Sequence, residues 1–538
     1  MDGRDDVATV PGLVRGAARA FAGREFVVTP DRTLTFGEAD ARSRRWAKRL
    51  LAAGIGKGSR VGLLFSQREE FVVAFLAITR VGAIAVPMST FAKPPELRRA
   101  LGHADVAVLL APRELGGSST EELFEAVFPQ LTETRAPRLL LEDAPFLRSI
   151  WILGGAAGGD ERAWSTNAPG LWELEDDPDV DDDLLDAVEA QVTPADPVVI
   201  VSTSGATAEP KAVVHTHGAQ VRHARAMAEV YELTPDDRTF TNMPFFWVGG
   251  LTVVVLSSMH VGAAVVTVER MDTTEMLDLI ERARPTRLLG WTLYERLSAD
   301  PSFGSRDLSS VVEMRPPELA APGLRHNSLG MTETGGPHTA ASRTNNAVDL
   351  PEHLRGSFGP PVPGTQHKIV DPDSGEELPG GVEGEICVRG GGLMDGLYKK
   401  ERSQAFDEDG WYHTGDKGYL RDGFLFFTGR LTEMIKTGGA NVAPREVELA
   451  IEAHPGVQAA FVVGIPDEER GELVGCIVCP APGHELDPAA LRDQLRDELA
   501  SYKIPRKVMV VHYDDLPWLP TGKMSKPRIV ELLSDAPA

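Results

Sequence analysis

The chain has 538 residues, which is too long for one hydrophobic core and predicts at least two domains. Its net charge of −24, from 79 acidic and 55 basic residues, argues against nucleic acid or an anionic membrane as the main partner. Hydrophobic residues make up 42% of the chain, as in ordinary globular proteins, and only three cysteines are present, which excludes a disulfide framework.

No secretion signal and no transmembrane segment are expected. The first residues, MDGRDDVATVPG, lack the charged-then-apolar pattern of a signal peptide. The apolar run 251–268 is long enough to raise the question of a membrane span, but two serines, a histidine and a glycine interrupt it. A buried helix leading into a strand explains this run better, so we expect a cytoplasmic protein.

Residues 34–200 alternate short apolar strands with amphipathic helices, a pattern typical of a parallel sheet with helical crossovers. The acidic run 173–186 holds much of the excess negative charge and is interpreted as a solvated loop. In chain order, the elements expected here are a strand at 60–65, a helix at 70–81, a strand at 83–87, a helix at 95–101 and a strand at 106–110.

Beyond residue 365 the pattern changes twice. Glycine-punctuated β segments occupy 365–398, and after Arg430 we expect a helix at 444–453, a strand at 459–463 and a helix at 488–499. The expected fold class is α/β. A large N-terminal body, residues 1–429, would combine mixed and parallel sheets, helical layers and a β segment, and residues 430–538 would form a small α+β lid domain. The C-x-x-C in LVGCIVC (473–479) is interpreted as part of a buried strand, not as a metal or redox site.

The segment 199–211, VIVSTSGATAEPK, is the most informative part of the chain. An apolar strand ends in a loop of hydroxyls and small residues that closes on Pro-Lys. Hydroxyl groups, closely approaching backbone N–H groups and a mobile lysine suit a polyphosphate. The G-x-x-x-x-G-K-[S/T] spacing of the P-loop is absent, and a polar turn after a buried strand is the alternative interpretation.

Four further segments carry residues suited to nucleotide chemistry. A carboxylate and two hydroxyls lie between glycines in GMTETGG (330–336), and an acidic residue ends the turn WYHTGD (411–416). The stretch GRLTEMIKTGG (429–439) continues into NVAPRE, and LPTGK (519–523) places a lysine on a turn. Each segment alone is a weak signal, whereas the order and spacing of all five are specific.

With these five segments, and with TLTFGE (33–38) and GAIAVP (82–87), the chain resembles the adenylate-forming superfamily of acyl-CoA synthetases, luciferases and peptide-synthetase adenylation domains. The resemblance extends over nearly the whole chain. It implies that ATP activates a small carboxylic acid to acyl-AMP with release of pyrophosphate, and that the acyl group then passes to the thiol of CoA. It also implies Mg²⁺, and it leaves a homodimer open.

The resemblance assigns roles that make physical sense. A carboxylate is a poor nucleophile and a triphosphate repels it, so positive charge must gather at the α-phosphate. The implied roles are β- and γ-phosphate binding for Thr203, Ser204, Gly205, Thr207 and Lys211; Mg²⁺ binding for Glu333; contact with the α-phosphate for Thr332; adenine recognition for Asn327; ribose binding for Asp416 and Arg430; stabilisation of charge between carboxylate and α-phosphate for Lys523; and the pantetheine-facing surface of the rotated lid for Gly438 and Gly439.

The superfamily's acid pocket corresponds to FFWVGG (245–250), Trp291 and the segment 329–338. An aromatic lining favours a hydrophobic acid over an amino acid, because no carboxylate follows the Pro-Phe element to hold an amino group. Fatty, aryl and steroid-type acids stay open, and the aromatic residues could instead belong to the core. The substrate-contacting residues expected are Phe246, Trp247, Gly250, Trp291 and Leu329.

The chain departs from the superfamily pattern at several places. Ala206 and Ala208 replace a hydroxyl and a glycine in the phosphate loop, and Leu329 replaces the aromatic residue that stacks on adenine. The segment 308–330 is short, and Thr432 stands at the hinge position usually held by Asp or Lys. These changes keep two alternatives open: a non-catalytic nucleotide-binding homologue, and an acyl-AMP ligase that loads a separate carrier protein.

Overall fold

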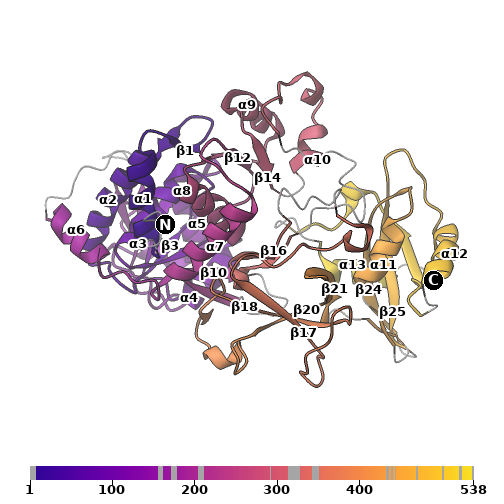
Figure 1. Cartoon of the computed structure of the whole chain (residues 1–538). Helices are drawn as coiled ribbons and strands as arrows, with labels where there is room; N and C mark the ends of the chain where they lie inside the picture. The colour runs from indigo at the N-terminus through magenta and orange to yellow at the C-terminus, as the bar shows by residue number, and fades with distance from the viewer. Residues whose placement is uncertain are drawn as a thin grey trace.

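The computed structural model shows a large body built from the N-terminal elements and a smaller group of C-terminal elements beside it (Figure 1). The described residues are 8–154, 162–170, 179–203, 211–290, 293–312, 328–341, 350–431, 435–437, 440–442, 444–467, 470–499, 502–519 and 524–535. Within them, no helix is both long and apolar enough to cross a membrane. The large body and the smaller C-terminal group confirm the expected α/β fold with a large N-terminal and a small C-terminal domain.

The largest sheet contains the parallel strands expected near the N-terminus. β10, β4, β3, β5, β8 and β9 run parallel in that spatial order, and β11 and β19 extend the sheet antiparallel beyond β10. Its strands are β3 (Arg60–Leu63), β4 (Ile84–Pro87), β5 (Val108–Pro112), β8 (Ser149–Leu153), β9 (Ser165–Ala168), β10 (Pro197–Thr203), β11 (Lys211–Thr216) and β19 (Gly396–Leu397).

Helices cover both faces of this sheet, which explains why its strands are apolar on both sides. One core cluster joins β3 and β4 to α1, α2 and α3, and a second joins the opposite face to α4 and α5. The run 69–80 is apolar almost all round, and it forms the buried helix α3. The helices are α1 (Val10–Phe21), α2 (Phe36–Ala52), α3 (Glu69–Arg80), α4 (Pro94–His103) and α5 (Thr120–Val127).

A second sheet of the body has the order β14-β12-β13-β1-β2 and includes the run that raised the question of a membrane span. Residues 251–268 form buried helical structure leading into β13, as expected. The elements are β1 (Glu25–Val28), β2 (Thr33–Thr35), β12 (Arg238–Thr241), β13 (Ala264–Thr267), β14 (Arg287–Leu289), α7 (His217–Val230), the π-helix Gly249–Leu256, α8 (Ser257–Val261), α9 (Thr273–Ala283) and α10 (Leu293–Ser298).

Antiparallel strands form the β segment that lies between the two domains in Figure 1. The sheet has the order β17-β18-β20-β21, and the hairpin β15–β16 precedes it in the chain. The strands are β15 (Leu329–Met331), β16 (Gly336–Thr339), β17 (Thr365–Val370), β18 (Gly384–Gly390), β20 (Tyr412–Arg421) and β21 (Phe424–Arg430), and a small hairpin elsewhere joins β6 (Glu114–Leu115) to β7 (Ser118–Ser119).

The C-terminal domain packs helices on its own sheet, with its own core. Cys476 and Cys479 are free and buried in β25, which confirms a strand at the C-x-x-C, and burial raises the pKa of both thiols. The elements are β22 (Ile435–Thr437), β23 (Ala440–Val442), β24 (Val457–Asp467), β25 (Gly471–Pro480), β26 (Lys507–Val510), α11 (Pro444–Glu452), α12 (Pro488–Glu498) and α13 (Lys526–Asp535).

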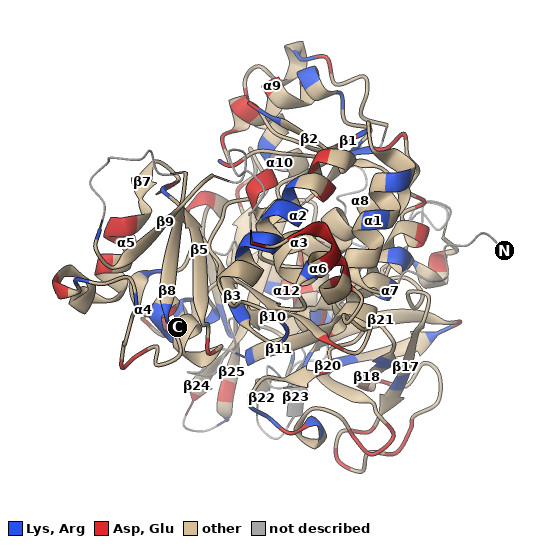
Figure 2. Cartoon of the chain, turned by 90° about the vertical axis from the view of Figure 1, so that its left-hand side faces the viewer, with Lys and Arg blue, Asp and Glu red and all other residues tan. Residues whose placement is uncertain are grey.

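The interpretation of 173–186 as a solvated loop is wrong for its second half. Asp181 caps the helix α6 (Asp182–Glu189) by accepting a hydrogen bond from the Leu184 N–H at 2.8 Å. Figure 2 shows α6, with its acidic residues in red, beside α2 and α3. The acidic residues are retained there because they pair with cations from other helices.

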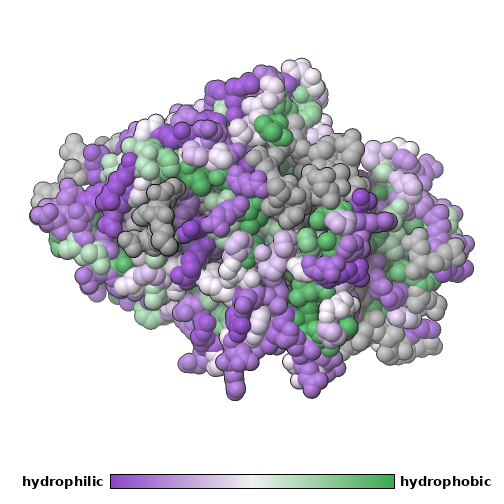
Figure 3. All heavy atoms as spheres, in the orientation of Figure 1, coloured by the Kyte–Doolittle hydropathy of each residue, from purple (hydrophilic) through white to green (hydrophobic). Residues whose placement is uncertain are grey.

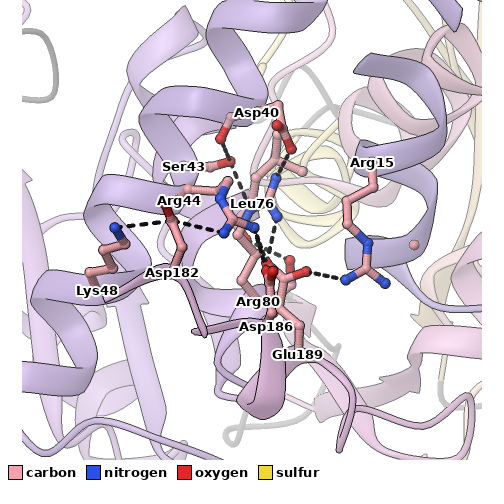
Figure 4. Close-up of polar contacts among 12 residues, drawn as sticks. Arg15, Asp40, Ser43, Arg44, Lys48, Leu76, Arg80, Asp182, Asp186 and Glu189 are labelled. Carbon is pink, nitrogen blue, oxygen red and sulfur yellow. Dashed lines mark hydrogen bonds and ion pairs between the residues drawn. The ribbon is translucent and has the colours of Figure 1, made fainter. Parts of the chain in front are cut away.

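These pairs form an ion-pair network, defined by Arg15, Asp40, Arg44, Lys48, Arg80, Asp182, Asp186 and Glu189 (Figure 4). Its centre is the fully buried Arg80, whose guanidinium pairs with Glu189 at 2.5 Å and with Asp40, and donates to the Ser43 hydroxyl at 2.9 Å. Arg15 binds the second oxygen of Glu189 at 2.7 Å. The network ties α1, α2, α3 and α6 together.

Candidate active site

The turn that carries Glu333 is held by backbone hydrogen bonds from two distant segments. Thr332–Thr334 form a 3-10 turn between β15 and β16, and the Met394 N–H donates to the Glu333 carbonyl at 2.9 Å. His215, on β11, donates from Nε2 to the Thr332 carbonyl at 2.8 Å. The turn is thus fixed against the edge of the large sheet, next to the strand that begins with Lys211.

The carboxylate of Glu333 lies between a cation and a phenol. Lys211 places its Nζ 3.7 Å from Oε1, and the Tyr412 hydroxyl donates to the same oxygen at 3.1 Å. Glu333 is only 8% exposed, whereas the Lys211 side chain is half-exposed and can reach a ligand in front of the site. Burial and the adjacent Glu333 charge raise the pKa of Tyr412, so its phenol stays protonated and donates.

A second carboxylate, Asp416, lies on the neighbouring pair of strands. Asp416 on β20 is paired with Arg430 on β21, and the Arg430 Nε is 2.9 Å from Oδ1. Asp416 is buried, with 2% of the residue exposed, whereas the Arg430 side chain is half-exposed. Glu385 fixes the turn before Asp416, because it accepts from the Gly415 N–H at 3.0 Å and contacts His413 at 2.7 Å.

Four of the five segments, which are distant in sequence, therefore meet in the part that the structure describes, and Lys523 of the fifth lies outside it. Lys211, Thr332, Glu333, Asp416 and Arg430 lie on one group of adjoining elements. A lysine ammonium beside a carboxylate suits binding of a metal–polyphosphate complex. The ammonium can pair with a phosphate and the carboxylate with the metal ion, instead of with each other. Glu333 is an oxygen donor of the type Mg²⁺ prefers, so the residues fit this ion, with phosphate oxygens and water as the other ligands.

The aromatic residues after Pro244 fall into two kinds. Phe245 belongs to the core, where its ring contacts Phe71 at 5.9 Å, so the core alternative holds for that residue. Phe246 and Trp247 contact each other and the 37% exposed Phe91, at 5.5 and 6.1 Å respectively. Phe246 is itself a buried member of the same core cluster, so Phe91 and the partly buried Trp247 are the rings of this trio that can contact a ligand.

Gly250 is explained by packing alone. A Cβ at this position would lie 2.2 Å from the Pro244 carbonyl oxygen, so only glycine fits. Leu329 is partly buried against the core of the β segment, and its N–H donates to the Thr339 hydroxyl at 3.3 Å. Neither observation decides whether these residues contact the acid, which stays a prediction.

Several expected site residues lie outside the described residues, or have side chains that do. Thr203 ends β10, but its side chain is not described. The departures Ala206, Ala208 and Thr432 and most of the short segment 308–330 fall in the same gaps. The expected site residues outside the described part are Ser204, Gly205, Thr207, Trp291, Asn327, Gly438, Gly439 and Lys523.

Sequence reasoning missed Tyr412 and a group of buried histidines. Tyr412 lies inside the WYHTGD segment, so its position was visible but its contact with Glu333 was not. Behind the Glu333 turn, four histidines from separate elements lie together, three of them buried and one partly buried. Their spacing in the sequence does not predict this group. They are His215, His223, His338 and His367, called the histidine nest below.

Comparison with known proteins gives a consistent result. Residues 14–398 match the family described as AMP-binding enzyme, and residues 446–523 match the AMP-binding enzyme C-terminal domain. The chain is 31% identical to feruloyl-CoA synthase of Amycolatopsis sp (92% of each chain covered) and 31% identical to indoleacetate–CoA ligase of Aromatoleum aromaticum (95% of this chain, 96% of the relative). The amide bond synthetase McbA of Marinactinospora thermotolerans superposes with a TM-score of 0.78 at 26% identity, covering 97% of this chain and 99% of that one.

Proposed function

The chain belongs to the AMP-binding enzyme family, and we propose that the groups around Glu333 and Asp416 carry its reaction with a hydrophobic acid. The enzyme is an AMP-forming acyl-CoA synthetase: with ATP it converts a carboxylic acid to acyl-AMP, and it then forms the acyl-CoA thioester. ATP and CoA are accordingly its co-substrates. The residues that act and the identity of the acid are proposals.

The single observation that carries the site assignment is the convergence of Lys211, Tyr412 and Glu333. In the proposed reaction Lys211, with Thr203, Ser204, Gly205 and Thr207, binds the β- and γ-phosphates, and Thr332 contacts the α-phosphate. Glu333 holds Mg²⁺, which when bound offsets negative charge on the triphosphate. Tyr412 keeps the carboxylate oriented, because its neutral phenol donates to Oε1.

Asp416 and Arg430 are proposed to bind the ribose hydroxyls, for which a buried carboxylate is a good double acceptor. Asn327 would recognise adenine. We place the domain boundary at 429/430, at the end of β21, so that Arg430 begins the lid. Lys523, on that lid, would stabilise the charge that develops between the acid and the α-phosphate, and after rotation Gly438 and Gly439 would face the pantetheine arm.

The proposed acid is hydrophobic and aryl-type. The buried Phe246 contacts Trp247, which is partly buried, and the exposed Phe91. Trp291, Gly250 and Leu329 are assigned to the same pocket by motif. The two relatives named above are a feruloyl-CoA synthase and an indoleacetate–CoA ligase, both named for aryl acids. We also propose a cytoplasmic location, supported by three buried cysteines that are all free thiols.

The reaction is tested by exchange of labelled pyrophosphate into ATP with a panel of aryl and fatty acids, followed by thioester formation with CoA. Lys523→Ala should lose about 10² or more in acyl-AMP formation, because a charge aimed at the transition state is removed. Supplied with preformed acyl-AMP and CoA, the same variant should make thioester at nearly the parent rate.

Gly439→Trp, which blocks the face presented after rotation, should show the reverse pattern. Lys503→Ala is the matched control, since this lid lysine pairs with Glu446 at 2.6 Å and is assigned no role in the reaction. If folded Lys523→Ala and Gly439→Trp proteins lose both half-reactions equally, the rotating-lid proposal is wrong. Absence of exchange with every acid would instead support the non-catalytic alternative.

A further inference from the structure

The histidine nest brings together imidazoles from four elements, away from the surface. His215 on β11, His223 on α7 and His338 on β16 are buried, and His367 on β17 is partly buried. His338 Nδ1 lies 2.7 Å from His367 Nε2, with ring centroids 4.9 Å apart. Burial lowers the pKa of His215, His223 and His367 to about 4 and that of His338 well below its usual value, so all four are neutral near pH 7.

A neutral His338–His367 pair cannot satisfy both of its N–H groups. If His338 Nδ1–H donates, His367 must carry its proton on Nδ1, and if His367 Nε2–H donates, His338 must carry its proton on Nε2. Neither His367 Nδ1 nor His338 Nε2 has a hydrogen-bond partner among the described residues. In either tautomer one buried N–H therefore has no acceptor among the described residues, and an unpaired buried donor destabilises the site.

The neighbouring groups do not supply that acceptor. His215 is held by its bond to the Thr332 carbonyl, and the Nε2 of His223 and the Nε2 of Gln220 also lack partners in the described part. Gln220 uses its amide oxygen to accept from the Thr252 hydroxyl. The Nδ1 of His215 and the Nε2 of His223 make no hydrogen bond to the His338–His367 pair either, so a ligand oxygen would complete the pair.

The nest adjoins the elements assigned to the acid. β16 continues directly from the turn that carries Glu333, and a Cβ at Gly336 would lie 2.8 Å from Val253 of the π-helix and 3.1 Å from His223 Nε2. Val253 lies about one helical turn beyond Gly250. His338 follows Gly336 by two residues, so its side chain leaves the strand on the same side, toward the π-helix and α7.

We propose that the acid carries a hydroxyl or carbonyl oxygen on the part remote from its carboxylate, and that the His338–His367 pair donates a hydrogen bond to this oxygen. The inference rests on the proposed function, because it assumes that the acid lies between the π-helix and β16. Its consequence is selectivity: an acid without the oxygen leaves the buried N–H unpaired and is activated less efficiently.

The test compares matched acids that differ only in one distal hydroxyl: cinnamate with 4-hydroxycinnamate, indoleacetate with 5-hydroxyindoleacetate, and octanoate with 8-hydroxyoctanoate. In the best-used pair, kcat/KM for acyl-AMP formation should favour the hydroxylated acid by about 10-fold or more, the equivalent of one hydrogen bond. His338→Leu should bring this ratio close to one, and His338→Gln, which keeps a donor, should retain much of it.

His217→Gln is the matched control, because His217 is buried on the same helix as His223 but accepts from the Val10 N–H on α1, away from the nest. This variant should keep the parent ratio. Equal use of both acids in every pair, or a preference that survives His338→Leu, would overturn the inference and indicate that the nest is completed by an internal water. Failure of the proposed function is distinguishable, since then no acid in the set supports pyrophosphate exchange.

Discussion

Glu189 and Glu333 are both buried carboxylates, yet their surroundings differ. Glu189 is bound on one oxygen by Arg80 at 2.5 Å and on the other by Arg15 at 2.7 Å, so two arginines of the chain neutralise its charge. Glu333 has a neutral phenol at 3.1 Å and the half-exposed Lys211 at 3.7 Å. The first environment holds four helices together, whereas the second leaves both the carboxylate and the lysine able to bind a ligand.

The same contrast extends to the polar groups behind each carboxylate. In the ion-pair network Arg44 binds Asp182 at 2.9 Å and Asp186 at 2.8 Å, and these partners raise the pKa of Arg44 although burial opposes them. In the histidine nest, several ring nitrogens have no hydrogen-bond partner among the described residues, and burial lowers the pKa values of the imidazoles. Buried charge with complete partners stabilises the fold, and buried polar groups with incomplete partners mark the place where a ligand contributes the missing contacts.

The largest expected effect separates the two regions by pH. An unfolded histidine takes up a proton below pH 6.5, whereas nest histidines with a pKa of about 4 stay neutral when folded, so stability is complete above pH 6.5 and falls as the pH drops toward 4. For the four residues of the nest the free energy of unfolding should fall by about 5 kcal/mol per pH unit near pH 5.5. Denaturant titrations at pH 7.0, 6.0 and 5.5 measure the slope.

His367→Gln should reduce this slope by about one proton, or about 1.4 kcal/mol per pH unit. The exposed His353, which contacts Asp422 at 3.0 Å, gives the control, since His353→Gln removes no buried imidazole. The ion-pair network contains no imidazole, so histidine protonation there contributes nothing to the slope. Stability that stays constant between pH 7.0 and 5.5 would contradict the contrast drawn here.

The next effect in size breaks the ion-pair network. Arg80→Met leaves Glu189 and Asp40 without their shared cation, and loss of one partner of a buried pair should cost about 3–5 kcal/mol in unfolding free energy. Removing both charges, as Arg80→Met with Glu189→Leu, should recover a large part of this loss. Thermal and chemical unfolding of the variants provide the comparison.

Arg496→Met is the control, because the Arg496–Asp493 pair is exposed on both sides and should be worth less than about 1 kcal/mol. Below the unfolding temperature, the activity per folded molecule should be the same in Arg80→Met and the parent. An Arg80→Met protein as stable as the parent, or one that is folded but inactive, would show that the network is not a purely structural feature.

The smallest effect sharpens the contrast at Glu333 itself. Tyr412→Phe removes the phenol that orients the carboxylate but keeps the ring, so kcat/KM for MgATP should fall about 3- to 10-fold, the equivalent of one hydrogen bond. Tyr419→Phe is the control on the same strand, since Tyr419 stacks on Phe426 with ring centroids 4.8 Å apart. Steady-state kinetics with MgATP as the varied substrate measure both; equal values for the two variants would remove Tyr412 from the site.

Much of the architecture could be predicted because local patterns and global fold agree. The alternation of apolar strands and amphipathic helices gave the parallel sheet, and the run 69–80 is helical and buried as its composition indicates. The motifs also predicted that Lys211, Glu333 and Asp416 share one site, and the structure brings their elements together: Lys211 begins β11, Glu333 lies in the turn after β15, and Asp416 lies within β20. The error at 173–186 arose because a dense run of acids resembles a solvated loop when its cationic partners are distant in sequence.

The sequence by itself therefore determined the family and the reaction, since these depend on residue type and spacing, whereas its assignment of the nucleotide-binding segments stays a prediction. Only the tertiary structure decided how buried polar groups are paired. Glu189 forms ion pairs with two arginines, Tyr412 donates a hydrogen bond to Glu333, and His338 and His367 share one hydrogen bond. These pairings join elements far apart in the chain. Their energies depend on burial and on distances of a few ångströms, which no local pattern encodes.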